Sequence, residues 1–209
     1  FAGTAGETQT VTVQINGDQV VELDESLTVN LSNVDAGGRE TDIAISDASG
    51  SLTIENDDNA TVGIKLSDSV VEAGGTVDLT VTLSSPVDVD VTVDADDVEG
   101  TAKVSGVNAS EFDYDDIDES LTFSNTSGAP LELTVQVSVN DDGIVELDEA
   151  LQVVLSTLAA NGRDVTLSNA TADVTIINDD SAVVTVNDVV IAEEDGSATL
   201  TVSLSAPVD

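Results

Sequence analysis

The chain of 209 residues contains no histidine, cysteine, methionine or tryptophan, and only 4 of its residues are basic. Without cysteine it forms no disulfides, and without histidine or cysteine it is a poor host for zinc or copper. The commonest nucleophile and base pairs of enzymes also need these residues. Aromatic residues make up only 2% of the chain, which leaves no platform for a sugar beside paired carboxylates. These absences predict a protein that is not an enzyme.

The charge is almost entirely of one sign, with 42 acidic residues against 4 basic ones. Such a surface repels nucleic acids and anionic membranes and attracts cations, so we expect no nucleic-acid partner. No apolar run reaches the roughly 18 residues of a membrane span, and residues 1–10 do not resemble a signal peptide. We therefore expect no direct membrane insertion. Regularly spaced Val, Leu and Ile residues predict an aliphatic core instead of disorder.

Three short motifs recur in the same order along the chain. They are Val21–Glu25 and Val145–Glu149, Asn56–Asp58 and Asn178–Asp180, and Ser84–Asp88 and Ser205–Asp209, separated by 124, 122 and 121 residues. This spacing indicates a repeat unit of about 120 residues, a common domain size. We expect residues 1–58 to be the C-terminal half of one repeat, 59–180 a complete repeat and 181–209 the N-terminal part of a third.

Hydrophobic residues alternate with polar ones over most of the chain. The pattern covers 77–83, 87–93 and 131–139, and turn signals such as Ala73–Gly75 and Ser85–Pro86 separate such segments. Strict alternation predicts strands with one buried and one solvated face, and no segment has the period of an amphipathic helix. The sequence predicts an all-β protein of tandem antiparallel β-sandwiches.

Carboxylates gather where predicted strands end. Asn140–Glu149 is a strongly acidic run directly after the strand that ends at Val139, Asn178–Asp180 follows another strand, and Glu72 begins a further strand pair. Carboxylates this dense repel one another unless a cation neutralises them. Ca²⁺ takes about 6 to 8 oxygen ligands with flexible geometry, so it suits such a cluster better than Mg²⁺. The expected cofactor is Ca²⁺.

The run Val139–Glu149, followed by Leu151–Ser156 and closed by Ile176–Asp180, resembles the Calx-beta domain. This domain is found in the regulatory region of sodium/calcium exchangers, in integrin β4 and in large bacterial surface proteins. The resemblance covers the whole chain, with all three segments in phase. It implies immunoglobulin-like, seven-stranded sandwiches that bind several Ca²⁺ ions at one tip.

The resemblance also implies the calcium ligands. In the complete repeat they are Glu72, Asp113, Asp141, Asp142, the carbonyl of Ile144, Glu146, Glu149, Asp179 and Asp180, with Glu111 as an alternative to Asp113. The equivalent residues of the partial repeats are Asp18, Val20, Glu22, Glu25, Asp57, Asp58 and Glu193. Gly143, Leu147 and Asn178 stand where exchanger-type domains carry acids, which predicts fewer ions or weaker binding. The first repeat, with Gly17 and Gln19 in its loop, departs further.

Two plainer interpretations remain open for these motifs. In one, Leu23 or Leu147 plugs the core while the neighbouring acids merely face water. In the other, Asp57–Asp58 and Asp179–Asp180 belong to solvated linkers.

The function that we expect is a calcium-binding stalk or spacer of a large secreted or cell-surface protein, related to adhesion. Its partners would be calcium ions and the neighbouring repeats of the same chain. One alternative is a calcium-sensing regulatory module of a membrane transporter. Another is a halophilic spacer without specific calcium sites.

Overall fold

The computed structural model describes residues 1–65, 69–73, 75–104 and 112–209. Its strands are β1 Glu25–Asn30, β2 Ser49–Ile54, β3 Ala60–Lys65, β4 Val70–Val71, β5 Thr76–Leu83, β6 Val91–Glu99, β7 Asp118–Phe123, β8 Glu132–Ser138, β9 Glu149–Ala159, β10 Val165–Asn169, β11 Thr171–Ile177, β12 Val184–Val186 and β13 Val202–Leu204. Among the described residues, Glu193–Asp195 form a short 3-10 helix, η2. In the described part of the chain, no helix is both long and apolar enough to cross a membrane.

Strands β3 to β11 form a β-sandwich of two sheets. One sheet has the order β10-β3-β5-β8 and the other the order β4-β11-β9-β6-β7. Successive segments β3 and β4 lie in opposite sheets, as do β10 and β11. When each pair is counted as one strand that changes sheets, the sandwich has seven strands, which confirms the predicted fold class.

Two pairings differ from a purely antiparallel sandwich. Strand β10 pairs with β3 in parallel, and β11 pairs with β4 in parallel, whereas every other ladder of the two sheets is antiparallel. The cause is topological, because the first and last strands of the unit lie side by side and run in the same direction. This arrangement brings the end of β4 and the end of β11 to the same tip of the sandwich.

The core is aliphatic, as the composition predicts. The inward residues of β5, Val77, Leu79, Val81 and Leu83, are all buried, with exposed fractions of 5% or less. Fully burying one such side chain contributes roughly 1.5 to 3 kcal/mol. Tyr114 and Phe123 are the large aromatic members of the core.

The predicted strand at 87–93 is only partly correct. Strand β6 begins at Val91, and Val87 lies before it in an isolated bridge to Val21. Val87 is nevertheless buried, because it packs into the core from the turn that joins β5 to β6. The alternation of this segment therefore reflects burial, but its first residues pair with a different part of the chain.

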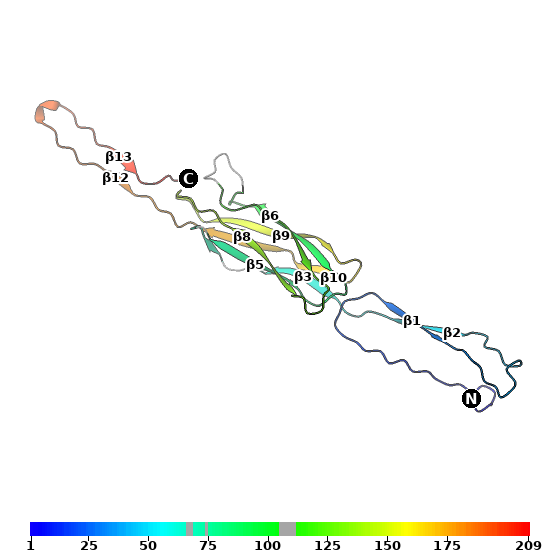
Figure 1. Cartoon of the computed structure of the whole chain (residues 1–209). Coiled ribbons are helices and arrows are strands. Elements are labelled where there is room, and N and C mark those ends of the chain that lie inside the picture. Colours follow the sequence, from blue (N-terminus) through cyan, green and yellow to red (C-terminus); the bar gives the residue numbers. More distant parts are fainter. Residues whose placement is uncertain (66–68, 74, 105–111) are drawn as a thin grey trace.

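Two long hairpins extend from opposite ends of the sandwich (Figure 1). The first contains β1 and β2, which pair from Glu25 with Ile54 to Asn30 with Ser49. The second contains β12 and β13, with η2 at its far end. Their side chains are largely exposed, and the buried core belongs to the central sandwich.

Candidate metal centre

The acidic loop between β8 and β9 is folded by its own side chains. The Asp142 carboxylate accepts a hydrogen bond from the amide of Ile144 at 2.6 Å, which turns the loop back on itself. The equivalent Asp18 accepts one from the amide of Val20 at 2.8 Å. The same local turn therefore forms in both copies of the loop, and Asp142 keeps its second oxygen for other contacts.

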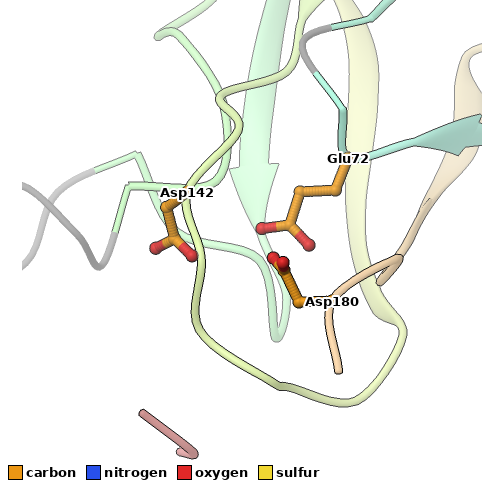
Figure 2. A group of neighbouring side chains, drawn as sticks. All are labelled: Glu72, Asp142 and Asp180. Atoms are coloured by element: carbon orange, nitrogen blue, oxygen red, sulfur yellow. The ribbon is translucent and has the colours of Figure 1, made fainter. Parts of the chain in front are cut away.

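The first carboxylate group consists of Glu72, Asp142 and Asp180. Glu72 follows β4, Asp142 lies on the loop after β8, and Asp180 follows β11. One oxygen from each lies within 4.8 Å of the others, and Figure 2 shows the side chains facing one another. Glu72 is only 4% exposed, so the sandwich holds a carboxylate where it has little water around it.

The second group consists of Asp113, Glu146 and Glu149, again with oxygens within 4.8 Å of one another. Asp113 is 9% exposed, and hydrogen bonds hold both its side chain and its backbone. Its carboxylate accepts a hydrogen bond from the Lys103 amide at 2.6 Å, and its own amide donates to the Lys103 carbonyl at 2.9 Å. Asp113 is therefore positioned before any ion arrives.

Burial and mutual repulsion raise the pKa of several of these acids. Desolvation, followed by the charge of Glu146, raises the pKa of Glu72 to about 7. Desolvation and a hydrogen bond with Asp113 raise the pKa of Glu149 to about 8. Desolvation, followed by the charge of Asp113, also raises the pKa of Glu146. Without a cation, the tip thus holds negative charge at a cost in free energy.

The donor set fits a hard divalent cation. Every side-chain donor in the two groups is a carboxylate oxygen, and three such residues can supply half or more of the oxygens around Ca²⁺. Within the described residues, Asp180 Oδ2 is also buried without a hydrogen-bond partner. A buried, unpartnered carboxylate oxygen is costly, and a bound cation would satisfy it.

Asn178 has a structural task that the sequence did not reveal. Its side-chain oxygen accepts from the amide of Glu146 at 3.2 Å, and its side-chain nitrogen donates to the carbonyl of Asp180 at 3.1 Å. Asn56 repeats both contacts with Glu22 and Asp58, at 3.2 and 2.8 Å. An aspartate here would accept but could not donate. The asparagine thus joins the acidic loop to the end of the last strand in both copies.

The remaining predicted ligands lie outside the two groups. Asp141 and Asp179 are exposed beside them, and their charges help to raise the pKa of Asp180 after desolvation. Ile144 contributes its amide to the loop turn, as described above. Glu111, the alternative to Asp113, lies outside the described residues.

Among the residues that the structure describes, the predicted ligands of the partial repeats do not form such a group. Two adjoining hollows of about 540 and 120 Å³ are lined by several acids of the first repeat. These acids are Asp18, Glu22, Glu25, Asp57 and Asp58. Glu193 lies in η2 at the far end of the C-terminal hairpin (Figure 1).

The leucine-plug interpretation is wrong. Leu147 is 86% exposed and Leu23 is 50% exposed, so neither seals the core. The buried residue of the first loop is Val21, with no exposed surface. The register differs from the expectation because Val21, two positions before Leu23, is the residue that bridges to Val87.

A family model described as the Calx-beta domain matches residues 3–58 and 55–180. The chain belongs to the Calx-beta domain family. This membership confirms the resemblance inferred from the acidic loop and the closing Asp pair.

Three solved structures of Calx domains are similar to the chain. The apo-form Calx CBD1 domain is 22% identical over 59% of this chain and 100% of that one, with a TM-score of 0.49. The calcium binding domain CBD12 of CALX1.1 is 23% identical over 58% and 45%, with a TM-score of 0.46. CBD12 from CALX1.2 is 25% identical over 54% and 41%, with a TM-score of 0.45. A search of curated protein sequences finds no match.

Proposed function

We propose that this stretch of Calx-beta repeats binds Ca²⁺ at the tip of the central sandwich and serves as a structural stalk or spacer. The observation that carries the proposal is the convergence of two carboxylate groups at one tip, one of them around the buried Glu72. Ca²⁺ accepts this many oxygen ligands and tolerates their irregular geometry. Family membership supports the same role and a protein without catalytic activity.

The stalk role is supported by the arrangement of the chain. The two hairpins leave the sandwich at opposite ends, so the molecule is elongated (Figure 1). In this proposal the chain belongs to a secreted or cell-surface protein and holds an adhesive part away from the cell. Extracellular calcium modules bind with Kd values of about 10⁻⁴ to 10⁻³ M, which matches the calcium level outside cells.

The test is a calorimetric titration of the whole chain with CaCl₂, repeated with MgCl₂ and in high NaCl. The proposal predicts saturable heats with Ca²⁺ that Mg²⁺ does not reproduce. Equal stabilisation by Mg²⁺ or by NaCl in accompanying thermal melts would instead favour a halophilic spacer whose acids bind no specific ion. Absence of any saturable calcium heat would refute the calcium site.

A calcium-sensing regulatory module is the second candidate. It is favoured by the position of Asp209, which follows the C-terminal hairpin and whose charge acts on Glu146. An ion at Glu146 would therefore change the electrostatic interaction with the segment that contains Asp209. A sensor predicts that calcium changes the angle between adjacent repeats, whereas a spacer predicts that the angle stays fixed.

A further inference from the structure

The acidic loop of the first repeat touches the central sandwich through its backbone. Val21 and Val87 form a parallel β-bridge. The amide of Val21 donates to the carbonyl of Pro86 at 2.9 Å, and the amide of Asp88 donates to the carbonyl of Val21 at 3.2 Å. The contact therefore joins the Val21–Glu25 motif to the Ser84–Asp88 motif.

The same contact occurs a second time in the molecule. Val145 and Val208 form a parallel bridge, with the amide of Val145 donating to Pro207 at 3.0 Å and that of Asp209 donating to Val145 at 3.2 Å. Val145 is the counterpart of Val21, and Val208 is the counterpart of Val87. Two copies of one contact, made by recurring motifs, indicate a property of the repeat.

A buried side chain strengthens the first of these contacts. Val21 is the one buried residue among residues 1–58, and it belongs to the core cluster of the central sandwich together with Val87 and Phe123. The loop of one repeat thus places a valine in the core of the next. Removing such a side chain from water stabilises the contact.

Charged side chains of both repeats also lie near this contact. Arg163, one of only 4 basic residues, binds Asp88 through two hydrogen bonds of 2.6 and 2.7 Å. The charge of Glu22, on the acidic loop of the first repeat, also acts on Arg163. Paired guanidinium and carboxylate groups of this geometry are among the stronger ionic contacts in proteins. The guanidinium therefore supplies a positive charge at the place where two acidic repeats meet.

Each side of the contact is also tied to its own repeat. Glu22, next to Val21, donates its amide to Asn56, which stands at the end of the last strand segment of the first repeat. On the other side, Ser84 accepts a hydrogen bond from the amide of Thr61 at 2.8 Å, which fixes the turn to β3. Neither partner of the bridge is a free loop.

We propose that the turn containing Ser84–Asp88, and its counterpart Ser205–Asp209, is a docking site for the acidic loop of the preceding repeat. The partner is a neighbouring copy of the repeat in the same chain. The joint is made by the β-bridge and, at the first copy, by the buried valine, so it is fixed without a bound metal. Arg163, held by Asp88 on the central sandwich, adds a positive charge that faces Glu22 of the first loop. This inference goes beyond the proposed function and does not depend on calcium binding.

The experiment uses the absence of cysteine. Thr53→Cys in β2 and Thr166→Cys in β10 are exposed positions for two spin labels on the full chain, and pulsed electron resonance measures the distance between them in EDTA. The proposal predicts a single narrow distribution of distances between the two labels. Val21→Asp places a charge in the core, and we expect a roughly twofold or greater broadening, as for a flexible linker.

The matched control is Val11→Asp, because Val11 is 71% exposed and lies in the same segment. It should leave the distance narrow. Val21→Ala provides a milder variant, and a thermal melt establishes that the sandwich of each variant is folded. A broad distribution in EDTA that narrows only with Ca²⁺ would overturn the inference while supporting the calcium site. An unchanged distance in both Val21 variants would overturn it as well.

Discussion

The acidic tips of the first and the central repeat share a loop sequence but differ in what surrounds it. Both loops fold with the same aspartate turn. Both are also held by the same asparagine clamp, the side-chain hydrogen bonds of Asn56 in the first repeat and of Asn178 in the central one. In the central repeat, Glu72 and Asp113 from the body of the sandwich complete two carboxylate groups. In the first repeat, the predicted acids line only open hollows. The loop motif therefore does not make the site by itself.

The two joints differ in how deeply the valine of the acidic loop is buried. Val21 docks on a complete sandwich and is fully buried, whereas Val145 docks on the two-stranded C-terminal hairpin and is only partly buried. The backbone bridge is the same in both. The valine of the acidic loop is therefore fully buried only where it contacts the complete sandwich.

The largest expected effect comes from removing acids of the central tip. Asp142→Asn with Asp180→Asn should abolish the calcium-dependent stabilisation that comes from the first carboxylate group, which would be about 2.7 kcal/mol at a calcium concentration 100-fold above Kd. Urea unfolding of the full chain with Ca²⁺ and with EDTA measures this difference.

The matched control is Asp18→Asn with Asp58→Asn, which removes the same charge from the first tip. It should leave the calcium-dependent stabilisation of the sandwich intact. If the two double variants lose calcium stabilisation equally, the distinction between the tips is wrong.

The pH dependence of the calcium-free protein gives the next largest effect. Glu72 and Glu149 keep their protons in the folded state up to about pH 7 and 8, whereas the same acids ionise near their model value of 4.5 when unfolded. Between these values the folded state binds more protons, so stability falls as pH rises. Thermal melts in EDTA at about pH 5 and about pH 9 should show the higher midpoint at the lower pH.

Calcium should remove most of this trend, because it binds the ionised carboxylates and releases their protons. A calcium-free protein whose melting midpoint rises with pH over this window would contradict the crowding of carboxylates at the tip.

A single neutral replacement sharpens the same point. Glu149→Gln removes one of the mutually repelling acids, so at alkaline pH we expect the calcium-free chain to become more stable and calcium binding to become weaker. Glu132→Gln, at an exposed position of β8, removes the same charge away from the tip and should do neither. Paired thermal melts and calcium titrations of both variants provide the check, and identical behaviour would count against a special role for Glu149.

The smallest expected effect concerns the asparagine clamp. Asn178→Asp loses the donor to the carbonyl of Asp180 and adds a charge, which should cost about 1 kcal/mol in EDTA. Calcium should restore part of the loss, because a cation bound at the tip would offset the added negative charge. No change in urea unfolding would show that the clamp contributes little.

Much of the fold could be predicted because alternation and burial coincide. Val77 to Leu83 alternate in sequence and are buried on one side in β5, and the acidic loop follows β8 at the expected place. The alternation at Val87 was misleading, since a turn residue packed in a core has the same hydrophobic character as a strand residue.

The sequence pointed to the acids that the structure brings together, but not to how they divide into two groups. The acidic run pointed to Asp142, Glu146 and Glu149, but no local pattern says which body residue faces which loop acid. The separation into two groups depends on how β4 and β11 meet at the tip. Asn178 read as a missing acid because its hydrogen bonds are invisible in sequence. The recurring Ser-x-Pro-Val-Asp motif was the available signal for the joint.

The most direct test of the central claim is the location of bound ions. Crystals of the full chain grown with Ca²⁺, or soaked with a lanthanide, would locate the ions by anomalous scattering. The account predicts ions held by Glu72, Asp142 and Asp180 and by Asp113, Glu146 and Glu149, with the tip of the first repeat less occupied. Ions bound at Asp57 and Asp58 but absent from the central tip would contradict it.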